Sequence, residues 1–167
     1  CAGDAEEEAG VAVEVGGVGK VLTVPEDGVW EVCYEPGEIP DGTNETEGSV
    51  SVTNEGGTTT ATGTLYVDTE VSVTFDNNIV ETDGTINAAE NADGTTLTGS
   101  VEAGSTVVVT IEGVDYEAVV TGDTWSLDLP TGVIAGGEYD LEVTVTATDA
   151  VDNTTSTTGV VHVDTIT

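Results

Sequence analysis

The fold of this chain is decided by the stretch Leu141-Glu142-Val143-Thr144-Val145-Thr146-Ala147, in which hydrophobic and polar residues alternate. A period of two is typical of an antiparallel strand with one buried face. Residues 106–111 and 71–75 have the same β-branched alternation, and turn-forming pairs such as Gly136-Gly137 separate such segments. The sequence therefore predicts an all-β sandwich, with at most one helical turn at residues 86–90.

The charge of the chain excludes several classes of partner. Its 167 residues include 33 acidic residues against a single Lys or Arg, which gives a formal net charge of -32. Nucleic acid and anionic membranes require a basic protein face, so we expect neither as a partner. No apolar run is long enough for a transmembrane segment. The hydrophobic fraction of 37% is nevertheless that of a folded protein rather than of a disordered acidic tail.

An internal duplication is visible in the sequence. Trp30 and Trp125 are 95 positions apart, and the triplet Val-Asp-Thr at 67–69 recurs 96 positions later. Matches that keep their order and nearly the same offset over about 60 residues indicate two copies of one sandwich. We therefore predict two tandem modules, residues 1–69 and 70–167.

The first module lacks a counterpart of the opening strand that the second module has. The triplet Glu-Ala-Gly occurs in both modules, at 8–10 and at 102–104, but only the second module has a predicted strand ahead of it, at residues 71–76. A sandwich without an edge strand exposes backbone groups that can pair with another chain. Two interpretations remain open. The chain is a piece of a longer array, or its first module closes differently; alternatively, a neighbouring identical subunit donates the strand and forms a head-to-tail filament.

Four stretches of the second module carry a family resemblance. They are Asp83-Gly84-Thr85-Ile86-Asn87-Ala88-Ala89-Glu90, residues 113–125, residues 143–150 and Val163-Asp164-Thr165, in this order. Together they resemble the bacterial Ig-like repeats of giant surface adhesins, which are biofilm-associated proteins exported by type I secretion. The first module matches loosely and contains cysteines, which such repeats usually lack. The resemblance implies two tandem Ig-like β-sandwich modules.

The function that the resemblance implies is that of a non-enzymatic, extracellular spacer at the cell surface. Such a spacer is a stiff unit whose partners are neighbouring repeats. A self-assembling filament subunit completed by strand donation is the alternative, and a carbohydrate-binding module is a further alternative. In arrays of this kind, calcium at the linkers is commonly the stiffening element.

Several oxygen-bearing side chains fit the ligand preference of calcium, which binds six to eight hard oxygen atoms. At the module junction and in two loops the candidate ligands are Asp68, Asp76, Asn77, Asn78, Asp83, Glu90, Asp149, Asp152 and Asn153. Asp and Asn also favour turns without any metal, and no spacing matches an EF-hand loop. A halophilic or marine origin, with the acidic residues as a solubilising coat, explains the charge equally well.

The two cysteines and the two tryptophans have different expected roles. Alternation predicts that both Trp residues are core residues and that Cys33 points outward. An outward cysteine in an extracellular protein seldom stays free, so we predict a disulfide between Cys1 and Cys33. Cys1 has another interpretation, because a chain that begins with Cys resembles a processed bacterial lipoprotein with an acylated first residue.

Catalysis finds little support in the sequence. His162 is the only imidazole, and it has no nucleophile motif for a partner. Residues at i and i+2 share a strand face, so His162 and Asp164 lie on the same face of the predicted strand. We interpret both as ordinary strand residues and predict no enzymatic activity.

Overall fold

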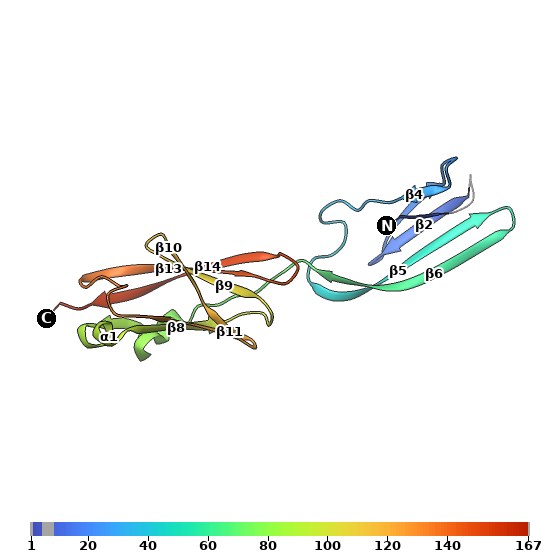
Figure 1. Ribbon diagram of the computed structural model, residues 1–167. Coiled ribbons are helices and arrows are strands. Elements are labelled where there is room, and N and C mark those ends of the chain that lie inside the picture. Colours follow the sequence, from blue (N-terminus) through green and yellow to red (C-terminus); the bar gives the residue numbers. More distant parts are fainter. Residues whose placement is uncertain (1, 5–8, 167) are drawn as a thin grey trace. The chain divides into compact units, whose positions relative to one another are not determined.

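The computed structural model describes residues 2–4 and 9–166, and it is built almost entirely of β-strands (Figure 1). The chain divides into two compact units, Cys1–Thr69 and Glu70–Thr167, which we call unit 1 and unit 2. Each unit contains a larger and a smaller sheet. The predicted fold class, an all-β sandwich, is confirmed.

Unit 2 is built from a five-stranded and a three-stranded sheet, with strand orders β10-β9-β13-β14-β7 and β11-β12-β8. The larger sheet contains β7 (Thr85–Asn87), β9 (Thr106–Ile111), β10 (Val114–Glu117), β13 (Glu138–Thr148) and β14 (Thr154–Asp164). The smaller sheet contains β8 (Thr95–Ser100), β11 (Val119–Thr121) and β12 (Thr124–Leu129). Neighbouring strands are antiparallel except for β7, which is parallel to β14.

Residues 71–77, which we call the opening segment, run along the outer edge of β8. The sequence predicts a strand at 71–76, and the structure forms it only in part. One bridge pairs Val73 with Val101, and the backbone N–H of Thr74 donates to Ser100 O at 2.8 Å. The segment is therefore an extended edge strand with few ladder bonds.

Two short helical pieces lie between the opening segment and β8. The 3₁₀ helix η1 (Asn77–Thr82) precedes β7, and α1 (Ala88–Asp93) follows it. Asn87 and Glu90 form a capping box at the start of α1. This box satisfies the first free N–H groups of the helix. The helix ends at Asp93, three residues past the single turn predicted to end at Glu90.

Unit 1 has a four-stranded sheet and a two-stranded sheet, with orders β3-β2-β5-β6 and β1-β4. The strands are β1 (Ala2–Asp4), β2 (Gly10–Val15), β3 (Val18–Thr23), β4 (Val29–Glu31), β5 (Thr43–Asn54) and β6 (Gly57–Asp68). The order β3-β2-β5-β6 matches β10-β9-β13-β14 of unit 2, and the pair β1-β4 matches β8-β12. Among the described residues of unit 1, no segment corresponds to the opening segment, as the sequence predicts.

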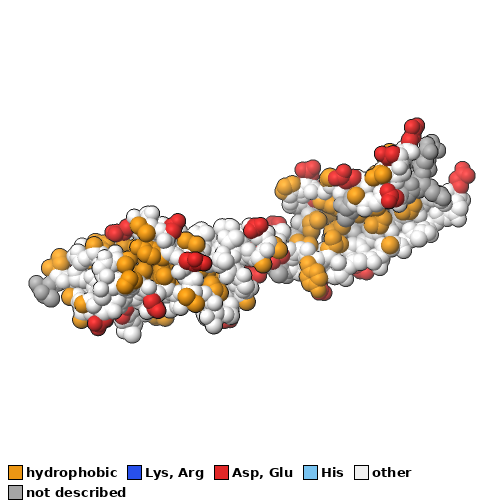
Figure 2. All heavy atoms as spheres, viewed as in Figure 1, with side chains coloured by type: hydrophobic (Ala, Val, Ile, Leu, Met, Phe, Trp, Pro, Cys, Tyr) orange, Lys and Arg blue, Asp and Glu red, His pale blue; other side chains and the backbone are white. Residues whose placement is uncertain are grey.

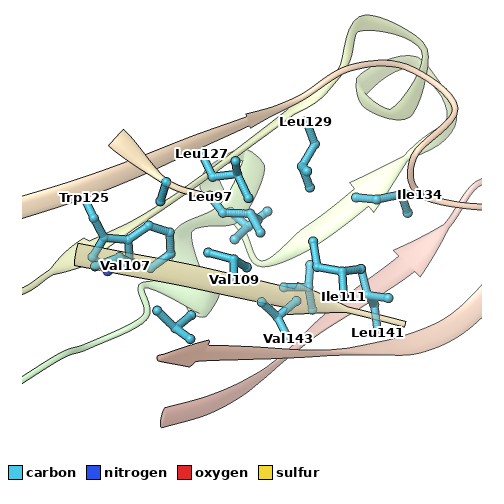
Figure 3. Close-up of a cluster of buried hydrophobic side chains, with 14 of the residues drawn as sticks. Leu97, Val107, Val109, Ile111, Trp125, Leu127, Leu129, Ile134, Leu141 and Val143 are labelled. Atoms are coloured by element: carbon cyan, nitrogen blue, oxygen red, sulfur yellow. The ribbon is translucent and has the colours of Figure 1, made fainter. Parts of the chain in front are cut away.

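The cores of the two units differ in size. In unit 2, Trp125, Leu127 and Leu129 of β12 point toward residues of β9 and β13, so side chains from both sheets meet between the layers (Figure 3). The predicted alternation of this strand is confirmed. In unit 1 the buried core is smaller, and its residues are Ala9, Val11, Val13, Val15, Val24, Trp30 and Val32.

Candidate functional site

Each unit contains a tryptophan that lies across a glycine of the neighbouring strand. Trp125 of β12 pairs with Gly99 of β8, and Trp30 of β4 pairs with Gly3 of β1. A Cβ atom at Gly3 would lie 2.8 Å from the Trp30 ring, and one at Gly99 would lie 2.5 Å from the Trp125 Nε1. Both tryptophans are buried, Trp30 at 6% exposure and Trp125 at 1%, which confirms their predicted core role.

In unit 2 the opening segment covers this tryptophan. The Trp125 Nε1 donates a hydrogen bond of 2.9 Å to Thr74 O, and the Phe75 and Trp125 ring centroids are 6.0 Å apart. The Phe75 ring also occupies the space that a side chain at Gly159 of β14 would need. The opening segment therefore closes one seam of the sandwich, between β8 of one sheet and β14 of the other.

Unit 1 has an apolar groove on its larger sheet. It has a volume of about 230 Å³ and is lined by residues of β2, β5 and β6: Val13, Glu14, Val15, Gly48, Ser49, Val50, Ala61, Thr62, Gly63, Thr64 and Leu65. Figure 2 shows hydrophobic side chains gathered in this hollow of unit 1. We call it the unit 1 groove.

The register of the strands identifies which residue of unit 1 corresponds to Gly159. Gly159 lies opposite Val143 of β13, which lies opposite Ile111 of β9. In unit 1, Gly63 lies opposite Gly48, which lies opposite Val15. Gly63 is therefore the counterpart of Gly159.

Gly63 and Gly159 differ in what faces them. A Cβ atom at Gly63 would meet nothing within 4 Å, whereas one at Gly159 would collide with Phe75. The Trp30 indole N–H likewise makes no hydrogen bond within the part of unit 1 that the structure describes, unlike that of Trp125.

The predicted calcium ligands Asp149, Asp152 and Asn153 lie in the turn between β13 and β14. The Asp149 Oδ1 accepts hydrogen bonds of 2.9 Å from the N–H groups of Val151 and Asn153, and its Oδ2 accepts one of 2.8 Å from Asn153 Nδ2. Burial would raise the Asp149 pKa, but these hydrogen bonds lower it below its ordinary value. The loop is thus held by its own hydrogen bonds, and Asp152 is exposed.

The other predicted ligands are spread over separate elements. Asp83 accepts from the Thr85 N–H at 2.9 Å, and Glu90 accepts from the Asn87 N–H at 2.9 Å in the capping box. Asp76 and Asn77 end the opening segment, Asn78 is exposed in η1, and Asp68 ends β6. Within residues 2–4 and 9–166, no three Asp, Glu, His or Cys side chains lie together as a metal site would require. The described acids do not by themselves form a calcium cage, and their role as ligands stays a prediction.

Cys33 is exposed, with its Sγ 3.7 Å from Glu31 Oε1. Cys1 lies outside the described residues, so the predicted disulfide stays a prediction. The pairing of β1 with β4 is compatible with this disulfide, because Ala2 lies opposite Glu31. These two residues are one and two positions from the respective cysteines along the chain.

The two described cation–carboxylate pairs lie in different units. Lys20 donates to Glu38 Oε2 at 2.5 Å and to Cys33 O at 2.6 Å in unit 1. In unit 2 the His162 Nδ1 is 2.9 Å from Asp140 Oδ1. The cross-strand register of β13 and β14 places Asp140 opposite His162, and this pairing is not visible in the local sequence.

Three solved structures similar to this chain come from large adhesins. One is a Ca²⁺-stabilised adhesin with which an Antarctic bacterium binds ice, 29% identical over 99% of this chain with a TM-score of 0.48. Another is a 1.5-MDa bacterial ice-binding adhesin, 28% identical over 98% of this chain with a TM-score of 0.49. A third is a tetra-tandem repeat in the extending region of a large adhesion protein, 22% identical over 97% with a TM-score of 0.43. These proteins are large adhesins, as are the proteins whose repeats the sequence resembles.

This chain covers 43%, 55% and 43% of those three solved chains, which is about half of their length. No family model matches the chain, and neither does any curated protein sequence. Among the described residues, no helix is long and apolar enough to cross a membrane.

Proposed function

We propose that this chain is a repeat segment of a bacterial cell-surface adhesin and that it acts there as a stiff extracellular spacer. The observation that carries the proposal is the way each end of the connection between the units is anchored. In unit 1, the Gly42 N–H donates to Thr69 Oγ1 at 2.8 Å. In unit 2, the Glu102 N–H donates to Ser72 O at 3.1 Å, and Val71 packs against the core.

Only Glu70 therefore lies between two anchored residues. A linker with so few free dihedral angles restricts relative motion far more than a flexible polar linker does. The same anchor recurs at the end of unit 2, where the Gly137 N–H donates to Thr165 Oγ1 at 2.7 Å. A repeated anchor at each exit strand is what a string of stiffly joined modules requires.

The surface charge fits the same role. Acidic side chains are distributed over both units in Figure 2, and the formal net charge is -32. Mutual repulsion on this scale keeps parallel chains apart and soluble. Calcium at the linker, with Asp68 and Asp76 among its ligands, is a further part of the proposal, and one of the similar structures is that of a Ca²⁺-stabilised adhesin.

The experiment that tests the spacer role measures whether the units tumble together. Backbone ¹⁵N relaxation of the full chain is expected to give one common rotational correlation time for both units. An insertion of three glycines after Glu70 should give each unit a shorter, separate correlation time. Independent tumbling of the units in the unmodified chain would overturn the proposal.

A further inference from the structure

The unit 1 groove has a specific shape and chemistry. Its lining is mainly apolar, and Glu14 is its only acidic residue. The neighbouring β6 is exposed over its first ten residues, whereas the matched β14 has its inner positions partly or fully buried. Leu65, on β6, is 38% exposed and lies against Gly48. A sandwich face of this kind is incompletely covered.

We propose that the unit 1 groove binds a β-strand with the pattern of residues 71–77, supplied by polypeptide that precedes unit 1 in the same protein. The inference rests on the proposed repeat architecture and adds the docking surface for the preceding segment. The bound strand would carry two apolar residues and then an aromatic residue at alternate positions, followed by Asp-Asn. Its aromatic ring would lie over Gly63, as Phe75 lies over Gly159.

The register of unit 2 predicts which backbone atoms of unit 1 receive this strand. In unit 2, the N–H groups of Thr74 and Asp76 donate to Ser100 O and Thr98 O of β8, at 2.8 and 3.0 Å. Because Gly3 corresponds to Gly99, the counterpart acceptors in β1 are the carbonyl oxygens of Asp4 and Ala2. The carbonyl oxygen that in unit 2 accepts from Trp125 would accept here from the Trp30 indole N–H.

The source of the strand follows from the order of the elements along the chain. The opening segment of unit 2 begins at Val71, directly after β6 of unit 1 ends at Asp68. In a repeat array each unit thus takes its seam-closing strand from the polypeptide just ahead of its first sheet strand. A second copy of this chain is a poorer donor, since within the described residues the matching segment already closes unit 2.

A synthetic peptide with the sequence of residues 70–78 tests the groove on the intact chain. Isothermal titration calorimetry should detect binding in a 1:1 ratio, and the Trp30 fluorescence should change. A control peptide with Ser in place of the residue corresponding to Phe75 should bind about tenfold or more weakly, because the buried ring is lost. The variant Gly63→Val fills the ring site and should abolish binding while the chain stays folded.

A fusion that places residues 70–94 ahead of Cys1 tests the source. Hydrogen exchange of β5 and β6 amides should slow at least tenfold in the fusion, and the peptide should no longer bind it. Equal binding of both peptides, or a fusion without slower exchange, would overturn the proposal. Concentration-dependent polymers of the unmodified chain that disappear in the fusion would also overturn it, because the donor would then be a second copy. None of these outcomes changes the result expected from the ¹⁵N relaxation experiment on the linker. The groove proposal and the spacer proposal can therefore fail independently of each other.

Discussion

The sheet of β9, β13 and β14 in unit 2 is covered along its inner face, whereas the register-matched sheet of β2, β5 and β6 in unit 1 is partly bare. On β13 the inner residues Val143 and Val145 are fully buried. Their counterparts on β5 are Gly48, which has no side chain and is covered by Leu65, and a half-buried Val50. The difference follows from the opening segment. One strand that crosses a seam converts a half-exposed sheet into a core, because it covers both layers at once.

The comparison also shows how each unit compensates for its own geometry. Unit 2 seals its seam with Phe75, Val80 and the parallel strand β7. In unit 1, Leu65 lies against Gly48 instead, and the Tyr34 hydroxyl lies within hydrogen-bond distance of two acceptors, Val13 O and Val18 O. We therefore expect unit 1 to be the less stable unit, which its amide exchange rates would show.

The largest expected effect is that of the predicted disulfide between Cys1 and Cys33 on unit 1. Closing a loop of about 33 residues stabilises a fold by roughly 3 to 4 kcal/mol on the chain-entropy model. Reduction, or the variant Cys33→Ser, should lower the free energy of unfolding of unit 1 by this amount. The amide hydrogens of unit 1 should then exchange faster. Exchange in unit 2 is the internal control and should not change. Two titratable thiols in the non-reduced, unfolded chain would contradict the prediction.

The second prediction compares the same substitution in the two units. Gly159→Val forces a side chain into the Phe75 ring and should destabilise unit 2 by about 1 to 3 kcal/mol, the usual range for overpacking. Gly63→Val is its matched control. It should leave unit 1 within about 0.5 kcal/mol of its present stability, because its Cβ meets open space. Both effects can be measured by chemical denaturation, with amide hydrogen exchange read separately for each unit. Equal losses of stability in the two variants would show that the two units do not differ at this position.

The third prediction concerns calcium at the linker. Calcium bound by the candidate ligands Asp68 and Asp76 should stabilise the units that supply them, by about 1.4 kcal/mol at ten times its Kd. Calorimetry should show a higher unfolding temperature in calcium than in chelator, and magnesium serves as the control ion. The double variant Asp68→Asn, Asp76→Asn should lose the difference. An effect confined to unit 2 would point to the Asp149 loop instead.

Much of the fold could be predicted because strand alternation is a local signal. Trp125 and Leu129 face inward as their period of two predicts, and Trp30 has the same role 95 positions earlier. The groove was harder to find, because the contrast of Gly63 with Gly159 depends on strand register and on what lies across the seam. Local sequence contains the two glycines but not the ring that faces one of them.

The candidate ligands show why a site is harder to predict than a fold. Turns and calcium sites use the same residue types, so sequence alone does not separate them. Asp149 and Glu90 use their carboxylates to accept local backbone N–H groups. The partner of His162 was missed for a related reason. A neighbour at i+2 can be read along one strand, whereas Asp140 is 22 positions away and becomes a neighbour only through pairing.

The smallest expected effect is a difference between the two units in how their stability depends on pH. The hydrogen bond with Asp140 raises the His162 pKa above its ordinary value, and burial opposes this only partly. In unit 1, the hydrogen bond from Lys20 lowers the Glu38 pKa. A raised histidine pKa contributes stability that is fully present below the unfolded pKa and is lost as pH rises through the folded pKa. A lowered carboxyl pKa contributes stability above its unfolded value, and this is lost as pH falls through the folded value.

Raising the pH from about 5 to about 8 should therefore weaken the His162–Asp140 pair of unit 2. It should leave the Lys20–Glu38 pair of unit 1 unchanged, because the lowered Glu38 pKa keeps that carboxyl group ionised over this range. An NMR titration of the His162 ring should give a pKa above the ordinary 6.5. The variant Asp140→Asn should bring that pKa down, whereas Glu38→Gln should leave it where it is. If the His162 pKa is the same in Asp140→Asn, the cross-strand hydrogen bond is not what raises it. The carboxylates of Asp164 and Glu138 would then be the cause of the raised pKa.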